Sequence, residues 1–261
     1  MKMSILRNDI FGLSITKKIC LSGLFIALVV IFNKVIALNY IPLIPFVRIS
    51  FGSIALLVFA SIVMGPLYGL VIGAAADVMG YFIFDASSFG WFPQITLTYA
   101  LLGFLPFFIY KLILLITNKK VMMIVEYGFM GLVLAGLTLF LAFNNSIVLY
   151  GTTYNFELYQ KILIPCIGLL LCGLIAVVNF IVDKKTKVEV PLNIYQISFI
   201  VFLTEILVNL LFGSLMKAWA FGWNMFLAIF IAQAILMFFN IPYNSYLVYV
   251  IVRISKNYIA R

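Results

Sequence analysis

The long apolar runs of the chain constrain its fold more than any other feature of the sequence. A membrane-spanning helix needs about 20 predominantly apolar residues, and polar, glycine and proline residues divide this chain into eight runs of about that length. The runs are 18–38, 49–64, 66–84, 94–116, 122–143, 162–182, 193–216 and 224–252. The sequence therefore predicts an all-α integral membrane protein with about eight transmembrane helices.

The composition excludes an ordinary soluble protein. Of the 261 residues, 66% are hydrophobic and 10% are charged, whereas soluble domains are about 45–50% apolar and about 25% charged.

The first run continues to about Leu38 without a small-residue cleavage site after it, so we expect it to stay in the membrane. Gly65 and Pro66 predict a tight turn, and Pro242 is expected to bend or break the last run. We interpret residues 1–261 as one transmembrane domain.

The basic residues predict how the chain crosses the membrane, because short cytoplasmic loops carry the excess of Lys and Arg. With the N-terminus inside, thirteen of the seventeen basic residues fall on the cytoplasmic side. The other four, Lys34, Arg48, Lys161 and Lys217, fall near the outer face. An even number of spans then returns the C-terminus to the cytoplasm. Topology thus accounts for the formal charge of +9.

Sequence signatures of catalysis are missing. The chain has no phosphate-binding loop, no HExxH or GxSxG motif and no histidine. Cys20, Cys166 and Cys172 lie in apolar runs without metal-binding or redox spacing. The basic residues form no patch interleaved with aromatic residues, as a nucleic-acid-binding surface would. We therefore expect no enzyme activity, no cofactor, no metal site and no nucleic-acid partner.

Asp77 is the most informative polar residue, because it lies in the apolar stretch GPLYGLVIGAAADVMGYF. Gly65, Gly69, Gly73 and Asp77 are four residues apart and share one stripe of a helix, where glycines let another backbone approach closely. The carboxylate is then expected to face protein. It either makes a structural bond between helices or contacts a ligand, and acids inside membranes are functional candidates by default. Glu205, near the middle of the seventh run, has the same two interpretations.

Two loops at the outer face add a second signal. Residues 39–48 follow the first run, and residues 85–93, with Trp91 and Phe92, follow the third. These aromatic residues are either ordinary interfacial anchors or part of a lid over a pocket for an aromatic anion. Lys34 either extends to the interface or contributes to that pocket. The candidate binding residues are Lys34, Arg48, Asp77, Trp91, Phe92, Gln94, Thr96, Glu205, Asn209, Lys217, Trp219 and Trp223.

The chain resembles the substrate-binding S components of energy-coupling factor (ECF) vitamin transporters, in particular the folate branch. The likeness covers about 18–116 and rests on SGLFIALVVIFNKVIAL, on PFVRISFGSIALLVFASIVMGPLYGLVIGAAADVMGYFIF and on FPQITLTYALLGFLPFFIYK. It resumes more loosely over 193–252, with TEILVNLLFGSLMKAWAFGW and the Ile-Pro pair at 241–242.

The resemblance implies a six-helix protein of the bacterial cell membrane that binds a vitamin from outside with high affinity. It would dock on a transmembrane scaffold subunit, the T component, and two ATPase subunits, and then topple in the membrane to release its ligand. Loops 39–48 and 85–93 would gate the site. Gly23 and Ala27 match the small-xxx-small surface by which the family's first helix contacts the scaffold.

The chain departs from the family pattern in two places. A hairpin of two further spans, 119–188, is inserted between core segments 14–118 and 189–255. The last helix has Ala232 and Gln233 where the family leads us to expect an arginine. Alternative ligands within the family are riboflavin, thiamine, pantothenate or a queuosine precursor. A stand-alone secondary carrier and a membrane-embedded enzyme remain as other classes, although no inverted repeat supports the carrier.

The chemistry of a folate suits the candidate residues. The pterin ring presents an N–H beside an amino group, and one carboxylate can accept both bonds in a dry site. Asp77 or Glu205 would supply that carboxylate. The anionic glutamate tail would lie toward the basic outer end near Lys34, Arg48 or Lys217, with Trp91, Trp219 or Trp223 stacking on the rings.

Overall fold

The computed structural model describes residues 13–37, 50–85, 90–116, 118–149, 152–185 and 192–259. Its elements are helices, three π-helical segments (η1 to η3), one 3-10 turn (η4) and one β-hairpin. In chain order they are α1 (Ile15–Val30), η1 (Ile31–Val35), α2 (Ser53–Met64), α3 (Pro66–Gly80), η2 (Tyr81–Asp85), α4 (Pro93–Ile113), α5 (Lys119–Phe143), β1 (Ser146–Leu149), β2 (Thr152–Asn155), α6 (Leu158–Lys185), α7 (Ile194–Thr204), η3 (Glu205–Gly213), α8 (Ser214–Phe221), η4 (Trp223–Met225) and α9 (Phe226–Ile259).

Seven helical stretches of the described chain are long and apolar enough to cross a membrane. This agrees with the predicted all-α membrane protein, with one difference at the second run. There α2 has only 12 residues, or about 18 Å at 1.5 Å per residue. It starts after Gly52, whose positive φ of 81° favours glycine, and all of its residues are buried. The helix is apolar because other helices surround it.

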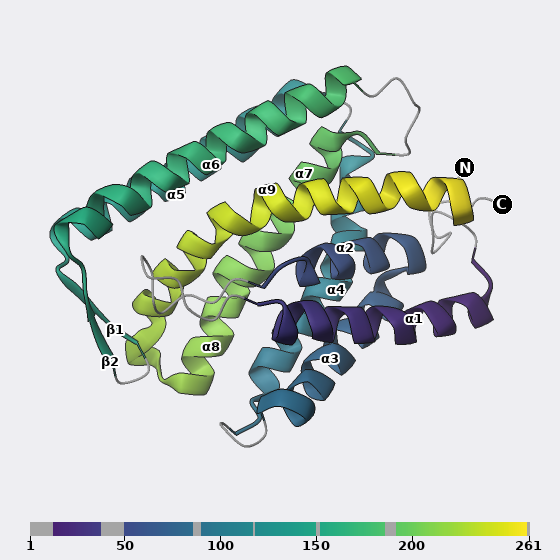
Figure 1. Cartoon of the computed structure of the whole chain (residues 1–261), viewed down its shortest axis with the longest axis horizontal. Coiled ribbons are helices and arrows are strands. Elements are labelled where there is room, and N and C mark those ends of the chain that lie inside the picture. Colours follow the sequence, from purple (N-terminus) through teal and green to yellow (C-terminus); the bar gives the residue numbers. More distant parts are fainter. Residues whose placement is uncertain are drawn as a thin grey trace.

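The expected turn between the second and third runs is confirmed at Gly65, which has a φ of 100° and lies directly between α2 and α3. Pro66 then occupies the first position of α3, where its missing N–H costs nothing. In contrast, α9 continues through Pro242 without a break. Figure 1 shows α9 curving along its length, so of the two expected outcomes at Pro242 the break does not occur.

The stripe of glycines on α3 packs closely on another backbone, as the four-residue spacing predicted, and the partner is α4. A Cβ atom added to Gly69 would overlap the backbone carbonyl of Gly103, and one added to Gly73 would overlap the carbonyl of Tyr99. The backbones of the two helices therefore lie in contact. This packing fixes the position of α4 relative to Asp77, one turn further along α3.

Helices α5 and α6, the two spans predicted to be an inserted hairpin, form a pair along one side of the molecule (Figure 1). At one end, α5 and α6 are connected through β1 and β2, which pair antiparallel with Ser146 opposite Asn155. This β-hairpin was not predicted, although its Ile, Val, Thr and Tyr residues are typical of strands.

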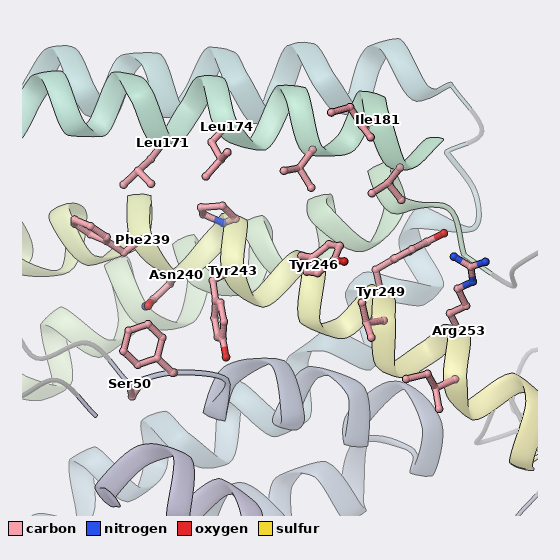
Figure 2. Close-up of a pocket in the computed structure, with 16 residues that line it drawn as sticks. Ser50, Leu171, Leu174, Ile181, Phe239, Asn240, Tyr243, Tyr246, Tyr249 and Arg253 are labelled. Carbon is pink, nitrogen blue, oxygen red and sulfur yellow. The ribbon is translucent and has the colours of Figure 1, made fainter. Parts of the chain in front are cut away.

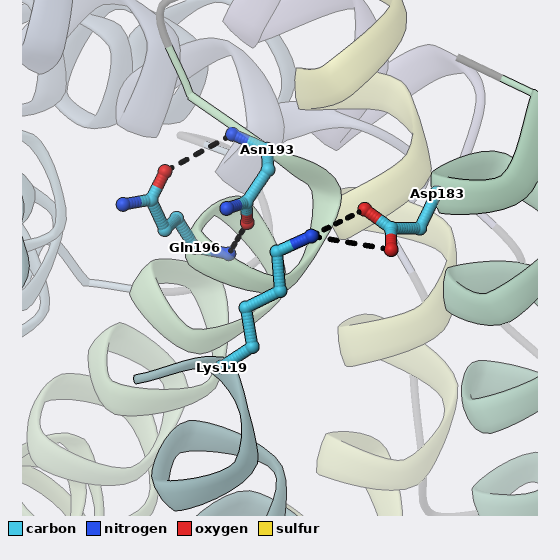
Figure 3. Close-up of polar contacts among 4 residues, drawn as sticks. All are labelled: Lys119, Asp183, Asn193 and Gln196. Atoms are coloured by element: carbon cyan, nitrogen blue, oxygen red, sulfur yellow. Dashed lines mark hydrogen bonds and ion pairs between the residues drawn. The ribbon is translucent and has the colours of Figure 1, made fainter. Parts of the chain in front are cut away.

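At the opposite end, Lys119 of α5 forms bonds of 2.9 and 3.2 Å with the two carboxylate oxygens of Asp183 on α6 (Figure 3). Beside this ion pair, Asn193 and Gln196 form a reciprocal capping box that starts α7. Further along α5, the buried acid Glu126 accepts a 2.6 Å bond from Ser198 of α7. Sequence reasoning missed Glu126. The bond links α5 to α7.

The start of α1 and the end of α9 lie at the same end of the molecule in Figure 1. The ends of α4 and α6 and the start of α5 carry further basic residues, Lys111, Lys184, Lys119 and Lys120. This arrangement is compatible with an even number of crossings if the short helix α2 is counted with the seven long helical stretches. The direction in which the chain crosses the membrane stays a prediction.

Candidate functional site

A polar cavity of about 320 Å³ lies among the helices that precede α5 and follow α6 in the sequence. Residues from η1, from the start of α2 and from α3, α4, η3, α8 and α9 line it, whereas α5 and α6 contribute none. Its polar lining residues are Asn33, Lys34, Ser50, Ser53, Asp77, Thr98, Tyr99, Asn209, Lys217, Gln233 and Asn240. Four of the twelve candidate binding residues, Lys34, Asp77, Asn209 and Lys217, are therefore brought together at one cavity.

Asp77 enters the cavity from α3 and is only 7% exposed. Its Oδ2 atom accepts a 2.6 Å hydrogen bond from the hydroxyl of Thr96 on α4. The same hydroxyl oxygen accepts a 3.0 Å bond from the indole N–H of Trp91. A chain of hydrogen bonds thus runs from Trp91 through Thr96 to the carboxylate. It fixes one carboxylate oxygen and restricts the orientation of the other.

Lys34 reaches the cavity from the π-helical segment η1. Its side chain passes beside Gly80, where an added Cβ would come within 3.1 Å of the lysine Cε. The ammonium group forms an ion pair with Asp85 at the end of η2. The positive charge of Lys34 is therefore balanced by Asp85, and Gly80 provides the space through which the lysine crosses α3.

The third charged group of the cavity is Lys217 on α8. Within the part of the chain that the structure describes, it forms no ion pair within 4.0 Å, but it interacts electrostatically with Glu205. Glu205 is 1% exposed and does not line the cavity. Its Oε2 atom accepts a 2.7 Å bond from the amide of Asn209, which does line the cavity. Glu205 therefore contacts the cavity only indirectly. It holds the side chain of Asn209 by a hydrogen bond and attracts the ammonium group of Lys217.

Several of these polar residues lie in three π-helical segments. Asn33 and Lys34 lie in η1, Asp85 ends η2, and Glu205 and Asn209 lie in η3. The wider π turn is rare, and when it occurs it is often found at functional sites. Of these segments, η1 and η3 contribute lining residues, whereas η2 ends with Asp85, the ion-pair partner of Lys34. Two of the elements that supply polar groups to the cavity therefore depart from regular helix geometry.

The aromatic candidates lie outside the cavity lining. Trp219 and Trp223 are 58% and 62% exposed, and Trp91 acts only through Thr96. Phe92 packs against Phe221 with a ring separation of 4.8 Å. The aromatic ring in the lining is Tyr99, which sequence reasoning missed. Ile95, Thr98, Tyr99 and Leu102 occupy positions i, i+3, i+4 and i+7, so they share one face of α4. This spacing was the sequence signal that could have identified Tyr99.

The remaining candidates are distributed as follows. Gln94 is half-buried, and its side-chain oxygen has no hydrogen-bond partner among the described residues. Arg48 and the whole of loop 39–48 lie outside the described residues, as does part of loop 85–93. Gly23 and Ala27 are exposed on α1, and an added Cβ at Gly23 would meet no atom within 4 Å. That face of α1 is open to a partner or to lipid.

The cavity offers a carboxylate, two ammonium groups and several amides to a ligand, with no group of three potential metal-binding side chains anywhere in the described ranges. This set suits an organic molecule that has both hydrogen-bond donors and anionic groups. Comparison with known proteins gives no match, either to a family model, to a curated protein or to a solved structure.

Proposed function

We propose that this chain is the substrate-binding subunit of an ECF-type importer, and that it captures folate or a related pterin at the outer side of a bacterial cell membrane. The observation that carries the proposal is the polar cavity, because all of its lining comes from the segments that resemble the S-component core. The inserted hairpin leaves this cavity unobstructed.

The charges of the cavity suit the two ends of a folate. Asp77 is oriented by Thr96 and can accept two parallel hydrogen bonds from the pterin N–H and amino groups. Lys217, which has no carboxylate within 4.0 Å among the described residues, can balance an anionic tail. Tyr99 is the lining residue that can pack on the pterin ring. A cavity of 320 Å³ is at the lower end of ligand-binding volumes, so the ring fits inside and the tail extends to the mouth.

Transport in this proposal needs partners, since the chain has no nucleotide-binding motif. The exposed face of α1 around Gly23 and Ala27 would contact the scaffold subunit, and two ATPase subunits would hydrolyse ATP. Small residues on this face let a second helix approach closely inside the membrane. Binding and docking would thus use different surfaces of the molecule.

Calorimetry on the purified chain tests the proposal. A folate should bind without nucleotide with a dissociation constant in the nanomolar range, or about −12 kcal/mol, because a scarce vitamin must be captured. Native mass spectrometry of gently purified protein should also find a retained ligand with the mass of a folate. Binding of riboflavin, thiamine, pantothenate or a queuosine precursor, but of no folate, would overturn the ligand assignment.

A further inference from the structure

A second cavity, a groove of about 1000 Å³ between α6 and α9, has a very different lining. Figure 2 shows Leu171 and Leu174 of α6 facing α9 across the groove, with Arg253 at one end. Apart from Arg253, the lining is formed by aliphatic and aromatic residues and by Ser50 and Asn240. We propose that this groove binds the acyl chains of an anionic membrane phospholipid, and that Arg253 holds the phosphate of its headgroup.

The dimensions and the surroundings of the groove suit acyl chains. Both of its helices, α6 and α9, are long and apolar enough to span a membrane, so the groove would lie in the bilayer and not in water. On α9 it extends from Phe239 to Ile254, a rise of about 22 Å along the helix, compared with about 30 Å for the bilayer core. Flexible acyl chains can fill such an apolar groove. If the groove were empty, the side chains that line it would lose van der Waals contacts.

The charge distribution selects an anionic headgroup. Arg253 is exposed and is the one charged residue in the groove lining as the structure describes it. Asp183 lies next to the lining residue Val182, but its charge is balanced by Lys119. Arginine binds phosphate oxygens with two parallel hydrogen bonds. Tyr249 and Tyr246, one and two turns before Arg253 on α9, add hydroxyl groups to the lining at this end.

The groove does not suit the proposed vitamin. It has no carboxylate to accept pterin N–H groups, and the polar groups of its lining at the end opposite Arg253 come from Ser50, Asn240 and the hydroxyl of Tyr243. Ser50 and Asn240 line the polar cavity as well, so the two cavities adjoin there. At this point in the groove wall, the rings of Phe51 and Tyr243 pack edge to face, with 5.5 Å between their centroids. A bound lipid would cover this wall from the bilayer side.

The test is a lipid titration of the purified full chain followed by native mass spectrometry. Phosphatidylglycerol and phosphatidylcholine with identical acyl chains are compared on the unaltered protein and on four variants. Arg253→Gln removes the headgroup contact, and Lys120→Gln removes an exposed charge on α5 as its control. Leu174→Trp fills the groove, and Leu169→Trp places the same ring on α6 outside the lining.

We expect one tightly bound phosphatidylglycerol per chain and weaker binding of phosphatidylcholine. Arg253→Gln should weaken phosphatidylglycerol binding at least about tenfold, as expected for a lost charge-assisted hydrogen bond, and should bring the two lipids to equal affinity. Leu174→Trp should remove the bound lipid. The two control variants should bind as the unaltered protein does.

Three results would overturn the proposal. Equal binding of the two lipids by the unaltered protein would exclude headgroup recognition, and an unchanged bound lipid in Leu174→Trp would place it elsewhere. Dimers that carry no lipid and dissociate in Leu174→Trp would identify a second copy of the chain as the occupant. Vitamin binding is measured on the same samples. Because none of the four substituted residues lines the polar cavity, failure of the lipid site leaves the proposed function intact.

Discussion

Asp77 is the residue whose replacement separates ligand binding from helix packing. If its carboxylate accepts hydrogen bonds from a ligand, Asp77→Asn places amide hydrogens against the ligand's donors. We expect the free energy of binding to weaken by at least about 2 kcal/mol, measured by calorimetry with a folate, while the protein still folds. Asp183→Asn is the matched control, because Asp183 is paired with Lys119 outside the cavity. Unchanged affinity with a lower melting temperature would assign Asp77 to packing.

Thr96 offers a test of how the carboxylate is oriented. Its hydroxyl donates to Asp77 and accepts from Trp91. Thr96→Val keeps the shape of the side chain but removes both bonds, so we expect about tenfold weaker ligand binding, or about 1.4 kcal/mol. Thr96→Ser keeps the hydroxyl and should restore most of the affinity. If the Thr96→Val and Thr96→Ser variants bind the ligand equally well, the chain of hydrogen bonds does not position the Asp77 carboxylate.

The charged residues of the cavity could be found in the sequence far better than its uncharged lining residues. Asp77, Lys34 and Lys217 are conspicuous because charges are rare in apolar runs. Tyr99 and Ser53 are ordinary residues of membrane helices, and only the packing shows that they face the cavity. Trp219 and Trp223 illustrate the opposite problem, because aromatic residues that stack on a ligand and aromatic residues that lie at a membrane interface have the same sequence signature.

At the scale of single elements, the helix pattern was predictable and its irregularities were not. Apolar length identified the long helices, and the glycine spacing predicted a close backbone approach to α3, although it did not identify α4 as the partner. The π-helical turn in η3 has no recognisable pattern, since it depends on whether each N–H bonds four or five residues back. The shortness of α2 was equally hidden, because a helix buried by its neighbours is as apolar as one that faces lipid.

The contact between α3 and α4 leads to a prediction about stability. Gly69→Ala would push a methyl group into the backbone of Gly103, so we expect a loss of about 1–3 kcal/mol from overpacking and a lower melting temperature in detergent. Gly128→Ala on α5 is the control, because its added Cβ meets no atom within 4 Å. There the better helix propensity of alanine should leave the melting temperature unchanged or raise it. Equal effects of the two substitutions would contradict the observed packing.

At the scale of the whole molecule, capture and transport are expected to depend on separate surfaces. The cavity lies among η1, α2, α3, α4, η3, α8 and α9, whereas Gly23 and Ala27 are exposed on α1, on a stretch that contributes no lining residue. Gly23 and Ala27 are four residues apart and share one face of the helix. Replacing both by leucine would fill the shallow surface there and keep the helix apolar and inserted in the membrane.

We therefore expect the double variant Gly23→Leu, Ala27→Leu to bind ligand within about 1 kcal/mol of the unaltered chain, since distant sites act almost independently. It should no longer co-purify with scaffold and ATPase subunits or support vitamin uptake by cells. Gly131→Leu, Ala135→Leu is the matched control, because these residues have the same spacing and are exposed on α5. Normal assembly of the first variant would place the docking surface elsewhere, and uptake by the unaltered chain in a host without any scaffold subunit would identify a stand-alone carrier.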